Sequence, residues 1–503
     1  MPAFASSRTS RPHKSASFHH ALRSWEDARY ADVIAELGTE GDGESRILLA
    51  KTYNRTQDYR AAVACLNKAK FETPRLQSIA EILSASAAER LDRAARFAPK
   101  LAPNAGEHIV ALRDFYAALS AWRGNDFDRS EDLATRAAAG GDLETRILAT
   151  DLLAWVAHSK GHLDESCRYF LSVIDQLNTG EIRDEHVRIN AVQALAFISA
   201  KSLDFGKLGR IERELESPSI SPATSRAYLG ALLSTAVLHS VAGEDEEHFR
   251  TLLAAKAVDV PKPFGALADT RLATFHRHHG EMESARMHMS FASEALEGVQ
   301  WSNSDVEERL AAVVFAAEAA AQRDRRAGPA FTRAVSFRGK QDLALGFEHD
   351  RHSIGVGYFA RARLSEMREK IDSSIEDYRR ATEIFDEQGD RYRSSLASLE
   401  ILRLEGGTRV SKSLRDRLRS LPSDSWLCRE AVRLTETAAS PLARLSPAER
   451  RVFEKICEGL TSRQIAEDLD RSASTVRNQT ISIFRKFGVS TRSALVAQAR
   501  AST

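Results

Sequence analysis

The chain has 503 residues, and its 71 Lys and Arg nearly balance its 70 Asp and Glu. This length exceeds one compact core unless the architecture is a repeat array, and the net charge of +1 excludes a uniformly basic nucleic-acid coat or an acidic tail protein. The apolar content of 43% excludes wholesale disorder, and only 13 Pro and 26 Gly favour helices over sheets.

Residues 1–20 are expected to form a flexible basic tail. Arg8, Arg11 and Lys14 stand among Ser, Pro and His, and no apolar segment follows them, which argues against a secretory signal. No run approaches the roughly 18 apolar residues that a membrane-spanning helix needs. The four cysteines are far apart and form no CxxC pair, so we expect neither a zinc ribbon nor a disulfide framework. These features predict a cytoplasmic protein without contact to a membrane.

Residues 21–437 predict a long array of paired helices. Apolar residues recur there at helical spacing, and a Gly, Asn or Asp turn repeatedly precedes a large anchor residue that a small residue follows three positions later. We expect the small residue to let two helices approach closely and the anchor to fill the groove between neighbouring pairs. The pattern is carried by Tyr59 and Ala62, Phe127 and Ser130, Leu163 and Ser166, Met282 and Ala285, Tyr378 and Ala381, with weaker units near Phe205, Glu247 and Phe331.

The anchors Tyr59, Phe127 and Leu163 lie 68 and 36 residues apart, about two periods and one. Periods from the mid-thirties to the low forties are typical of stacked helix–turn–helix units. The pattern resembles tetratricopeptide repeats in degenerate form, and it predicts an all-α fold built as an α-solenoid. The array is expected to end near Gly406–Gly407 and Pro422–Asp424.

A short linker, residues 438–444, is predicted before a small basic module at residues 445–503. Pro441 blocks helix continuation and pushes its predecessor toward an extended conformation. Residues 441–503 contain 11 Lys and Arg against 6 Asp and Glu, whereas the preceding 440 residues carry a net charge of −4. The stretch 471–503 holds six basic residues and no acid.

Capping signals divide this module into four helices. Ser446 with Glu449, and Thr461 with Gln464, each predict a capping box at a helix start, and Gly459 is expected to end the first helix. Ser472 is predicted to start the third helix, and Phe487 and Gly488 to end it. Ser490 is predicted to start the fourth helix.

The third helix has an open face opposite its apolar stripe. Two short helices joined by a tight turn, with a basic second helix, fit the major groove of DNA. Arg477 can donate two hydrogen bonds to a guanine edge, and Asn478 can pair with adenine. Ile481 is apolar on this face, where it either meets a thymine methyl group or is one of the isolated apolar residues common on protein surfaces.

The segment 445–496 resembles, without gaps, the LuxR/FixJ-type DNA-binding module, a four-helix helix-turn-helix found in bacterial regulators. Four positions depart from the usual pattern, namely Ala448, Arg451, Ser462 and Gln479. The positions that match are Glu449, Val452, Gly459, Thr461, Ile465, Ala466, Leu469, Ser472, Thr475, Val476, Arg477, Phe484, Lys486, Gly488, Val489 and Arg492.

This resemblance implies binding to double-stranded DNA, with Arg477, Asn478 and Ile481 facing base edges. It also implies a homodimer formed through the fourth helix, and localisation at the nucleoid when the protein is bound to DNA. The residues that it implies for phosphate contacts are Ser462, Arg463, Ser474, Thr475, Gln479, Arg485 and Lys486.

The large domain shows no signature of an enzyme. The phosphate-binding pattern GxxxxGK[ST] is absent, so no nucleotide site is expected, and no alternating strand–helix pattern points to a receiver domain. We expect no catalytic residue, no metal and no cofactor. The array is instead suited to a protein or peptide partner.

Two stretches carry an alternative interpretation. His276–Glu281, with Met282 and Met287–Met289 nearby, could bind a soft metal, although a solvated repeat turn is the simpler interpretation. The acidic run Gly243–Glu247 is most simply another turn, but it could dock the basic module and hold it away from DNA.

The sequence therefore predicts a transcription regulator whose helical array receives a protein or peptide signal. An alternative is an interaction scaffold with only non-specific affinity for DNA. The basic third helix with Arg477 and Asn478 on its open face favours the regulator.

Overall fold

The computed structural model describes residues 16–38, 42–67, 69–92, 97–101, 105–216, 220–299, 306–337, 340–341, 343–347, 350–406, 410–439 and 445–501. The predicted all-α fold is confirmed. Strands in the described residues are confined to one two-residue hairpin, β1 (Ser336–Phe337) with β2 (Lys340–Gln341). Most of the expected tail, and residues 440–444 of the expected linker, lie outside the described residues. Residues 16–20 differ from the expectation, because they begin a helix in which Phe18 is buried.

The helices follow one another along the whole chain. The first group consists of α2 (Ala16–Glu26), α3 (Tyr30–Leu37), α4 (Gly43–Arg55), α5 (Tyr59–Asn67), α6 (Pro74–Leu91), α7 (Glu107–Arg123), α8 (Phe127–Gly140), α9 (Leu143–Ser159) and α10 (Leu163–Asn178). The second consists of α11 (Glu185–Ser202), η1 (Phe205–Lys207), α12 (Leu208–Leu215), α13 (Ser225–Ala242), α14 (Asp245–Lys256), α15 (Lys262–His278), α16 (Met282–Ala295), α17 (Val306–Ala321) and α18 (Ala327–Val335). The last consists of α19 (Leu343–Gly346), α20 (Arg351–Met367), α21 (Ile371–Glu387), α22 (Arg391–Leu404), α23 (Lys412–Leu418), α24 (Trp426–Ala439), α25 (Pro447–Cys457), α26 (Ser462–Asp468), α27 (Ala473–Phe487) and α28 (Arg492–Ala501).

Small residues bring the two helices of a pair together, as the repeat pattern predicts. Ser130 and Ser166 are fully buried, and their hydroxyls donate to the carbonyls of Ala118 (2.9 Å) and Ala154 (2.8 Å) in the preceding helix. The anchors are less buried than expected, since Phe127 is only half-buried. The small residue, rather than the anchor, therefore determines how closely the helices pack.

One predicted unit is out of register. Tyr378 was expected to be an anchor at a helix start, but it lies in the middle of α21 and is completely buried. The positions of anchor and small residue belong to Ile371 and Ser374, because α21 begins at Ile371 and the Ser374 hydroxyl donates to the carbonyl of Ala362 at 2.9 Å. A buried aromatic seven residues into a helix has the same apolar character as an anchor, which explains the error.

The turns between paired helices share one backbone conformation. The residue two positions before the second helix has a positive φ, for example Asn125 (61°) before α8, Gly161 (81°) before α10 and Gly280 (78°) before α16. Gly and Asn tolerate this left-handed region best, which explains why they recur in the sequence pattern.

The array curves so that distant segments meet. Helix α11 contacts α22, and α13 contacts α24, although nearly 200 residues separate each pair in sequence. Leu414 of α23 and Leu427 of α24 are fully buried in one cluster with Val241 and Leu399. Helices α23 and α24 therefore pack with the array beyond the irregular stretch at Gly406, within the range 21–437 expected for it.

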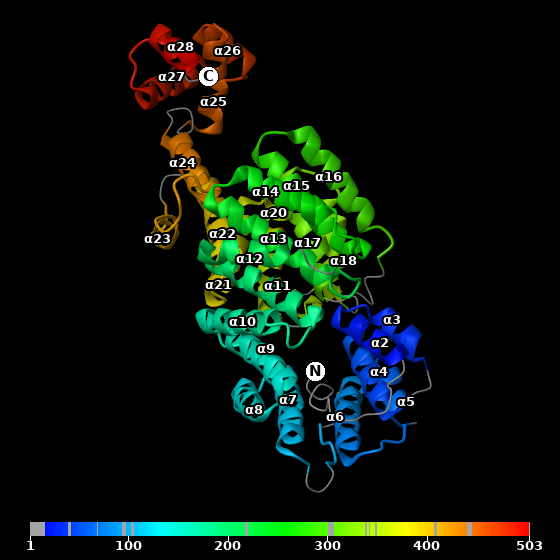
Figure 1. The fold of residues 1–503 in the computed structure, drawn as a ribbon. Helices are drawn as coiled ribbons and strands as arrows, with labels where there is room; N and C mark the ends of the chain where they lie inside the picture. Colours follow the sequence, from blue (N-terminus) through cyan, green and yellow to red (C-terminus); the bar gives the residue numbers. More distant parts are fainter. Residues whose placement is uncertain are drawn as a thin grey trace.

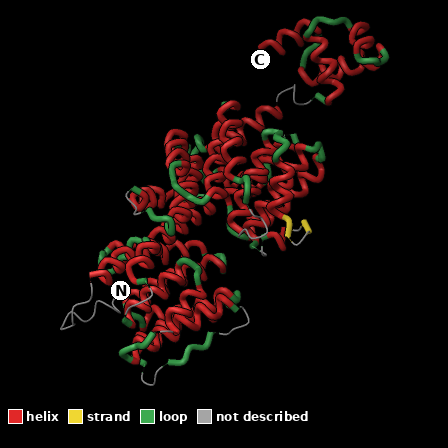
Figure 2. The backbone as a smooth tube through the Cα atoms, turned by 90° about the vertical axis from the view of Figure 1, so that its right-hand side faces the viewer, coloured by secondary structure: helices red, strands yellow, loops and turns green. Residues whose placement is uncertain are grey.

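Helices α25–α28 form a separate module at one end of the elongated molecule, beyond α24 (Figures 1 and 2). The module has an apolar cluster of its own, in which Val452, Ile456, Ile465 and Ile483 are completely buried. No helix in the described part of the chain is long and apolar enough to cross a membrane.

Candidate nucleic-acid interface

Two capping boxes orient the first two helices of the module. The Ser446 hydroxyl accepts from the N–H of Glu449, whose carboxylate accepts from the N–H of Ser446, and Thr461 and Gln464 make the same exchange before α26. Gly459, with φ of 92°, follows the end of α25. These features confirm the predicted helix boundaries.

A tight turn then places α27 across α26. Asp470 has a positive φ of 49°, and the Ser472 hydroxyl caps α27 by accepting from the N–H of Thr475. Helix α27 ends at Phe487, and Gly488 takes the left-handed conformation expected of a C-terminal glycine.

The start of the fourth helix differs from the prediction by one residue. Thr491, not Ser490, caps α28, since its hydroxyl accepts from the N–H of Ala494 at 3.2 Å. Both residues have a hydroxyl suited to capping, so the sequence alone did not distinguish them.

Helix α27 has one buried face and one open face. Val476, Ile483 and Phe487 are buried against the other helices of the module. On the opposite side Arg477, Asn478, Ile481, Arg485 and Ser474 are exposed, and 59% of Ile481 is accessible. The second helix of a helix-turn-helix thus presents side chains for both polar and apolar contacts.

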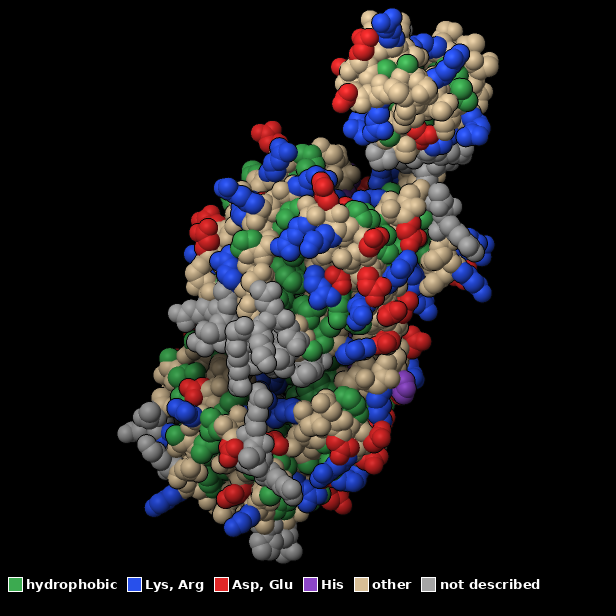
Figure 3. Space-filling model, turned by 180° about the vertical axis from the view of Figure 1, so that it is seen from behind, with side chains coloured by type: hydrophobic (Ala, Val, Ile, Leu, Met, Phe, Trp, Pro, Cys, Tyr) green, Lys and Arg blue, Asp and Glu red, His purple; other side chains and the backbone are tan. Residues whose placement is uncertain are grey.

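The open face carries unengaged donors. Among the described residues, no hydrogen bond or ion pair engages the side chains of Arg477, Asn478 or Arg485. Figure 3 shows Lys and Arg side chains spread over the visible surface of the module. A basic surface with free guanidinium and amide groups suits a polyanion with hydrogen-bonding edges.

The residues expected to contact phosphate lie around this face and differ in exposure and in the partners of their side chains. Ser462 is half-buried at the start of α26, and Arg463 is exposed with Glu467 at 3.4 Å. The hydroxyls of Ser474 and Thr475 each lie 2.8 Å from the Ser472 hydroxyl, close to the N-terminus of α27. Gln479 is half-buried next to Arg477 and Asn478.

The side chain of Lys486 forms an ion pair within the module. Its ammonium donates to Glu449 at 2.5 Å, and Ser482 donates to the same carboxylate at 2.7 Å. Although desolvation raises the pKa of Glu449, the hydrogen bonds from Lys486, Ser446 and Ser482 lower it to about 2.

Sequence reasoning assigned Glu449 only to capping and missed that it joins α25 to α27. An acid in a capping box next to a basic helix was the available signal. Arg492 has a similar joining role, because it donates to the carbonyls of Ile456 and Leu460 at the end of α25.

The first alternative stretch spans the end of α15 and the turn before α16, with Met287–Met289 inside α16, and the acidic run spans the turn before α14 and the first residues of that helix. His276 lies 2.5 Å from Glu281, and His288 lies 2.7 Å from Asp269. Within the described residues, no group of three or more His, Cys, Asp or Glu side chains is placed to hold a metal. In the acidic run, Asp245 accepts from Arg429 of α24 at 2.8 Å.

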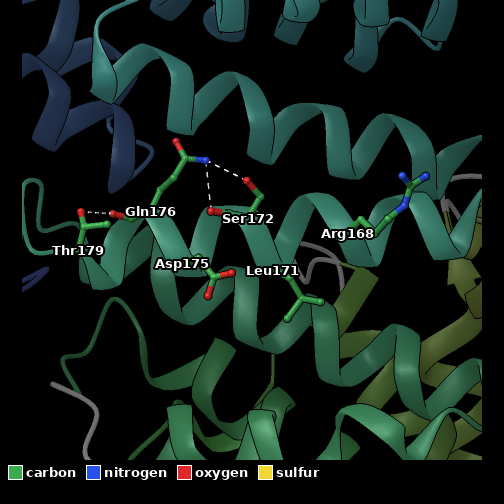
Figure 4. A pocket seen from close by; sticks show the side chains of 6 residues that line it. All are labelled: Arg168, Leu171, Ser172, Asp175, Gln176 and Thr179. Atoms are coloured by element: carbon green, nitrogen blue, oxygen red, sulfur yellow. Dashed lines mark hydrogen bonds between the residues drawn. The ribbon is translucent and has the colours of Figure 1, made fainter.

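A hollow of about 400 Å³ lies on the surface of α10, but it lacks the features of a ligand-binding site (Figure 4). All of its lining residues belong to this helix and its C-cap, and the Gln176 amide donates back to Ser172. No lining group comes from a second element, so we assign no ligand to it. The lining residues are Arg168, Leu171, Ser172, Asp175, Gln176 and Thr179.

Comparison with solved structures gives a weak overall match. The crystal structure of the APC/C hetero-tetramer Cut9-Hcn1 has 13% identity, and the match covers 96% of each chain with a TM-score of 0.26. At this score the likeness carries no argument, and the repeat architecture stands on the helix pairing described above. A search of curated proteins finds no match to the chain.

Comparison with family models identifies the C-terminal segment. Residues 443–499 match the family described as bacterial regulatory proteins, luxR family. The match spans the four helices whose caps, buried stripe and open basic face are described above. The segment 443–499 is therefore a LuxR-type helix-turn-helix domain, the DNA-binding part of a transcription regulator.

Proposed function

We propose that the protein binds promoter DNA sequence-specifically by placing α27 in the major groove. The observation that carries this proposal is the open face of α27, where the side chains of Arg477 and Asn478 are exposed and unengaged among the described residues. Arg477 would donate two hydrogen bonds to guanine, Asn478 would pair with adenine, and Ile481 would contact a thymine methyl group.

Contacts to phosphate would fix the register of the module on DNA. Ser462 is the first residue of α26, and Ser474 and Thr475 lie in the first turn of α27, where helix N-termini favour anions. Arg485 would add a charge at the other end of α27. We include Arg463 and Gln479 and leave Lys486 out, because Glu449 engages its ammonium.

Binding as a dimer would give the affinity and specificity that one small module lacks. A single module buries little surface on DNA, whereas two modules read paired half-sites. We propose that α28 forms the dimer interface, with a two-fold symmetric operator as the consequence. The protein would then associate with the bacterial nucleoid.

The helical array would receive the regulatory signal from a protein or peptide. Stacked helix pairs produce an extended curved surface suited to such partners. The contacts of α24 with α13 and α22 support this role, since they tie the helix that precedes the DNA-binding domain to the body of the array.

The test is selection of binding sites by the full-length protein from a random DNA library at two salt concentrations. The proposal predicts enrichment of a short two-fold symmetric site at both concentrations. Salt-sensitive binding without enrichment would contradict sequence-specific recognition and favour a scaffold with non-specific DNA affinity.

A further inference from the structure

A small cavity lies where the array meets the helix that leads to the DNA-binding domain. Its volume is about 40 Å³, and side chains of α13, α14, α15, α22 and α24 line it. Helix α24 contributes its first residue, Trp426, whose ring stacks on His278 with the centroids 4.3 Å apart and the planes at 14°. The cavity is thus bounded on one side by α24 itself.

The cation in this cavity has no acceptor among the residues that the structure describes. Arg271 of α15 lines the cavity, and no described residue forms a hydrogen bond or ion pair with its guanidinium. Two carboxylates are near and already engaged: Glu318 accepts from Arg277 at 2.6 Å, and Asp245, which also lines the cavity, accepts from Arg429 at 2.8 Å. An unpaired cation in a cavity is costly unless an anion joins it.

Further donors and flat apolar surfaces surround Arg271. Within the described part of the chain, the Tyr392 hydroxyl and the Trp426 indole N–H have no hydrogen-bond acceptor. Phe275 also lines the cavity, packed edge-on against His248 with ring centroids 5.1 Å apart. The site therefore combines a guanidinium and two neutral donors with aromatic walls.

We infer that this cavity binds a small carboxylate of about the size of acetate, with its carboxylate on Arg271. A guanidinium donates two parallel hydrogen bonds to a carboxylate, and Tyr392 can donate a third. At roughly 10–15 Å³ per water-sized group, the cavity has room for about three such groups, which is the size of a carboxylate head.

The position of the site gives the ligand direct access to α24. Trp426 begins this helix, and Arg429 one turn later holds Asp245 of α14. This ligand site is separate from the protein or peptide signal proposed above and does not depend on it. Binding at the site can be measured without DNA.

The test is calorimetric titration of the full-length protein with acetate and, separately, with the neutral acetamide. We expect the acid to bind and the amide to bind at least about tenfold more weakly, since a charged hydrogen-bonding pair is lost. Arg271→Gln should weaken binding of the acid by at least about tenfold. Arg286→Gln, at an exposed position on α16 outside the cavity, should bind like wild type.

Thermal unfolding separates a ligand-binding role from a structural one. Because Arg271 has no partner among the described residues, Arg271→Gln should melt at or above the wild-type temperature in the absence of ligand. The inference is overturned if wild type fails to bind the acid, if acid and amide bind equally, if Arg271→Gln binds like wild type, or if this variant melts below Arg286→Gln.

Discussion

Arg363 and Arg477 both lie on helices, but their surroundings differ. Arg363 of α20 is largely buried and donates to Glu400 of α22, and Arg403 donates to the same carboxylate at 2.9 Å. Arg477 of α27 is exposed, and no partner engages its side chain among the described residues. The first arginine joins two helices of the array, whereas the second is available to another molecule.

The same difference, between engaged and exposed charged side chains, holds between the helical array and the open face of α27. In the array, charged side chains bridge helices that are distant in sequence, as Lys51 does to Glu144 at 2.5 Å and Arg55 to Asp184 at 2.9 Å. Ion pairs of this kind hold the curved stack in one shape. On the open face of α27, Arg477 and Arg485 form no ion pair with any residue that the structure describes, which is the property expected of a DNA-contacting surface.

The largest effect should come from the buried side of α27. Ile483 is completely buried, so Ile483→Ala should lower the free energy of unfolding of the C-terminal module by about 3 kcal/mol. Ile481→Ala, two residues away on the open face, should change it by less than about 0.5 kcal/mol. Urea denaturation of residues 445–503 followed by circular dichroism measures both. Equal losses in the two variants would show that α27 does not have the two faces described.

The next largest effect concerns the ion pairs of the array. Arg363→Met should lower the free energy of unfolding of the full-length protein by about 2 kcal/mol, because Glu400 loses one of its two cations in a largely buried place. Arg380→Met removes an exposed arginine paired to Glu376 and should leave the free energy of unfolding nearly unchanged. Unchanged stability of Arg363→Met would mean that these pairs do not hold the array.

A pH titration tests the contact between α25 and α27. Glu449 has a pKa of about 2 in the folded module, below the value of about 4.3 in an unfolded chain. Its stabilisation is therefore fully present above about pH 5 and is lost as pH falls through the folded pKa. With screening at the partly exposed Lys486, we expect a loss of about 1–2 kcal/mol between about pH 6 and pH 3.

Denaturation of the module at several pH values measures this loss. Glu449→Gln should be less stable than wild type at neutral pH, and the difference should shrink as the pH falls. A constant difference across the range would exclude the ionised carboxylate as its source.

The smallest effect concerns the apolar residue on the open face. Ile481→Ser should weaken binding to the selected operator by about 1 kcal/mol through loss of contact with a thymine methyl group, without changing stability. Replacing individual thymines of the operator by uracil removes that methyl group. Wild type should then lose affinity at one position, where Ile481→Ser loses none. If every uracil substitution affects both proteins equally, Ile481 reads no methyl group.

The sequence predicted the fold well where a feature depends only on residues that are close together in the chain. The capping boxes at Ser446 and Thr461 lie where the sequence placed them, because each needs only four consecutive residues. The shift from Tyr378 to Ile371, and the continuation of the array through α24, depend on packing against distant helices. Spacing along the chain does not carry that information.

The same limit applies to the interface. The residues expected to face base edges, Arg477, Asn478 and Ile481, lie together on an open helix face, as their spacing on one helix predicts. Lys486 was grouped with the DNA-contacting residues, but Glu449, 37 residues earlier, occupies it. Periodicity identifies the face on which a side chain lies, and only the tertiary structure identifies its partner.

We expect the exposed charges of α27 to serve DNA recognition and not the fold. The most direct measurement is a titration of full-length wild type, Arg477→Ala and Arg485→Ala against the selected operator and random DNA at several salt concentrations. Arg477→Ala should lose about 1–3 kcal/mol on the operator and almost nothing on random DNA. Arg485→Ala should weaken binding to both DNAs. It should also reduce the slope of log affinity against log salt concentration by about one. Equal losses of both variants on the operator and on random DNA would contradict the account.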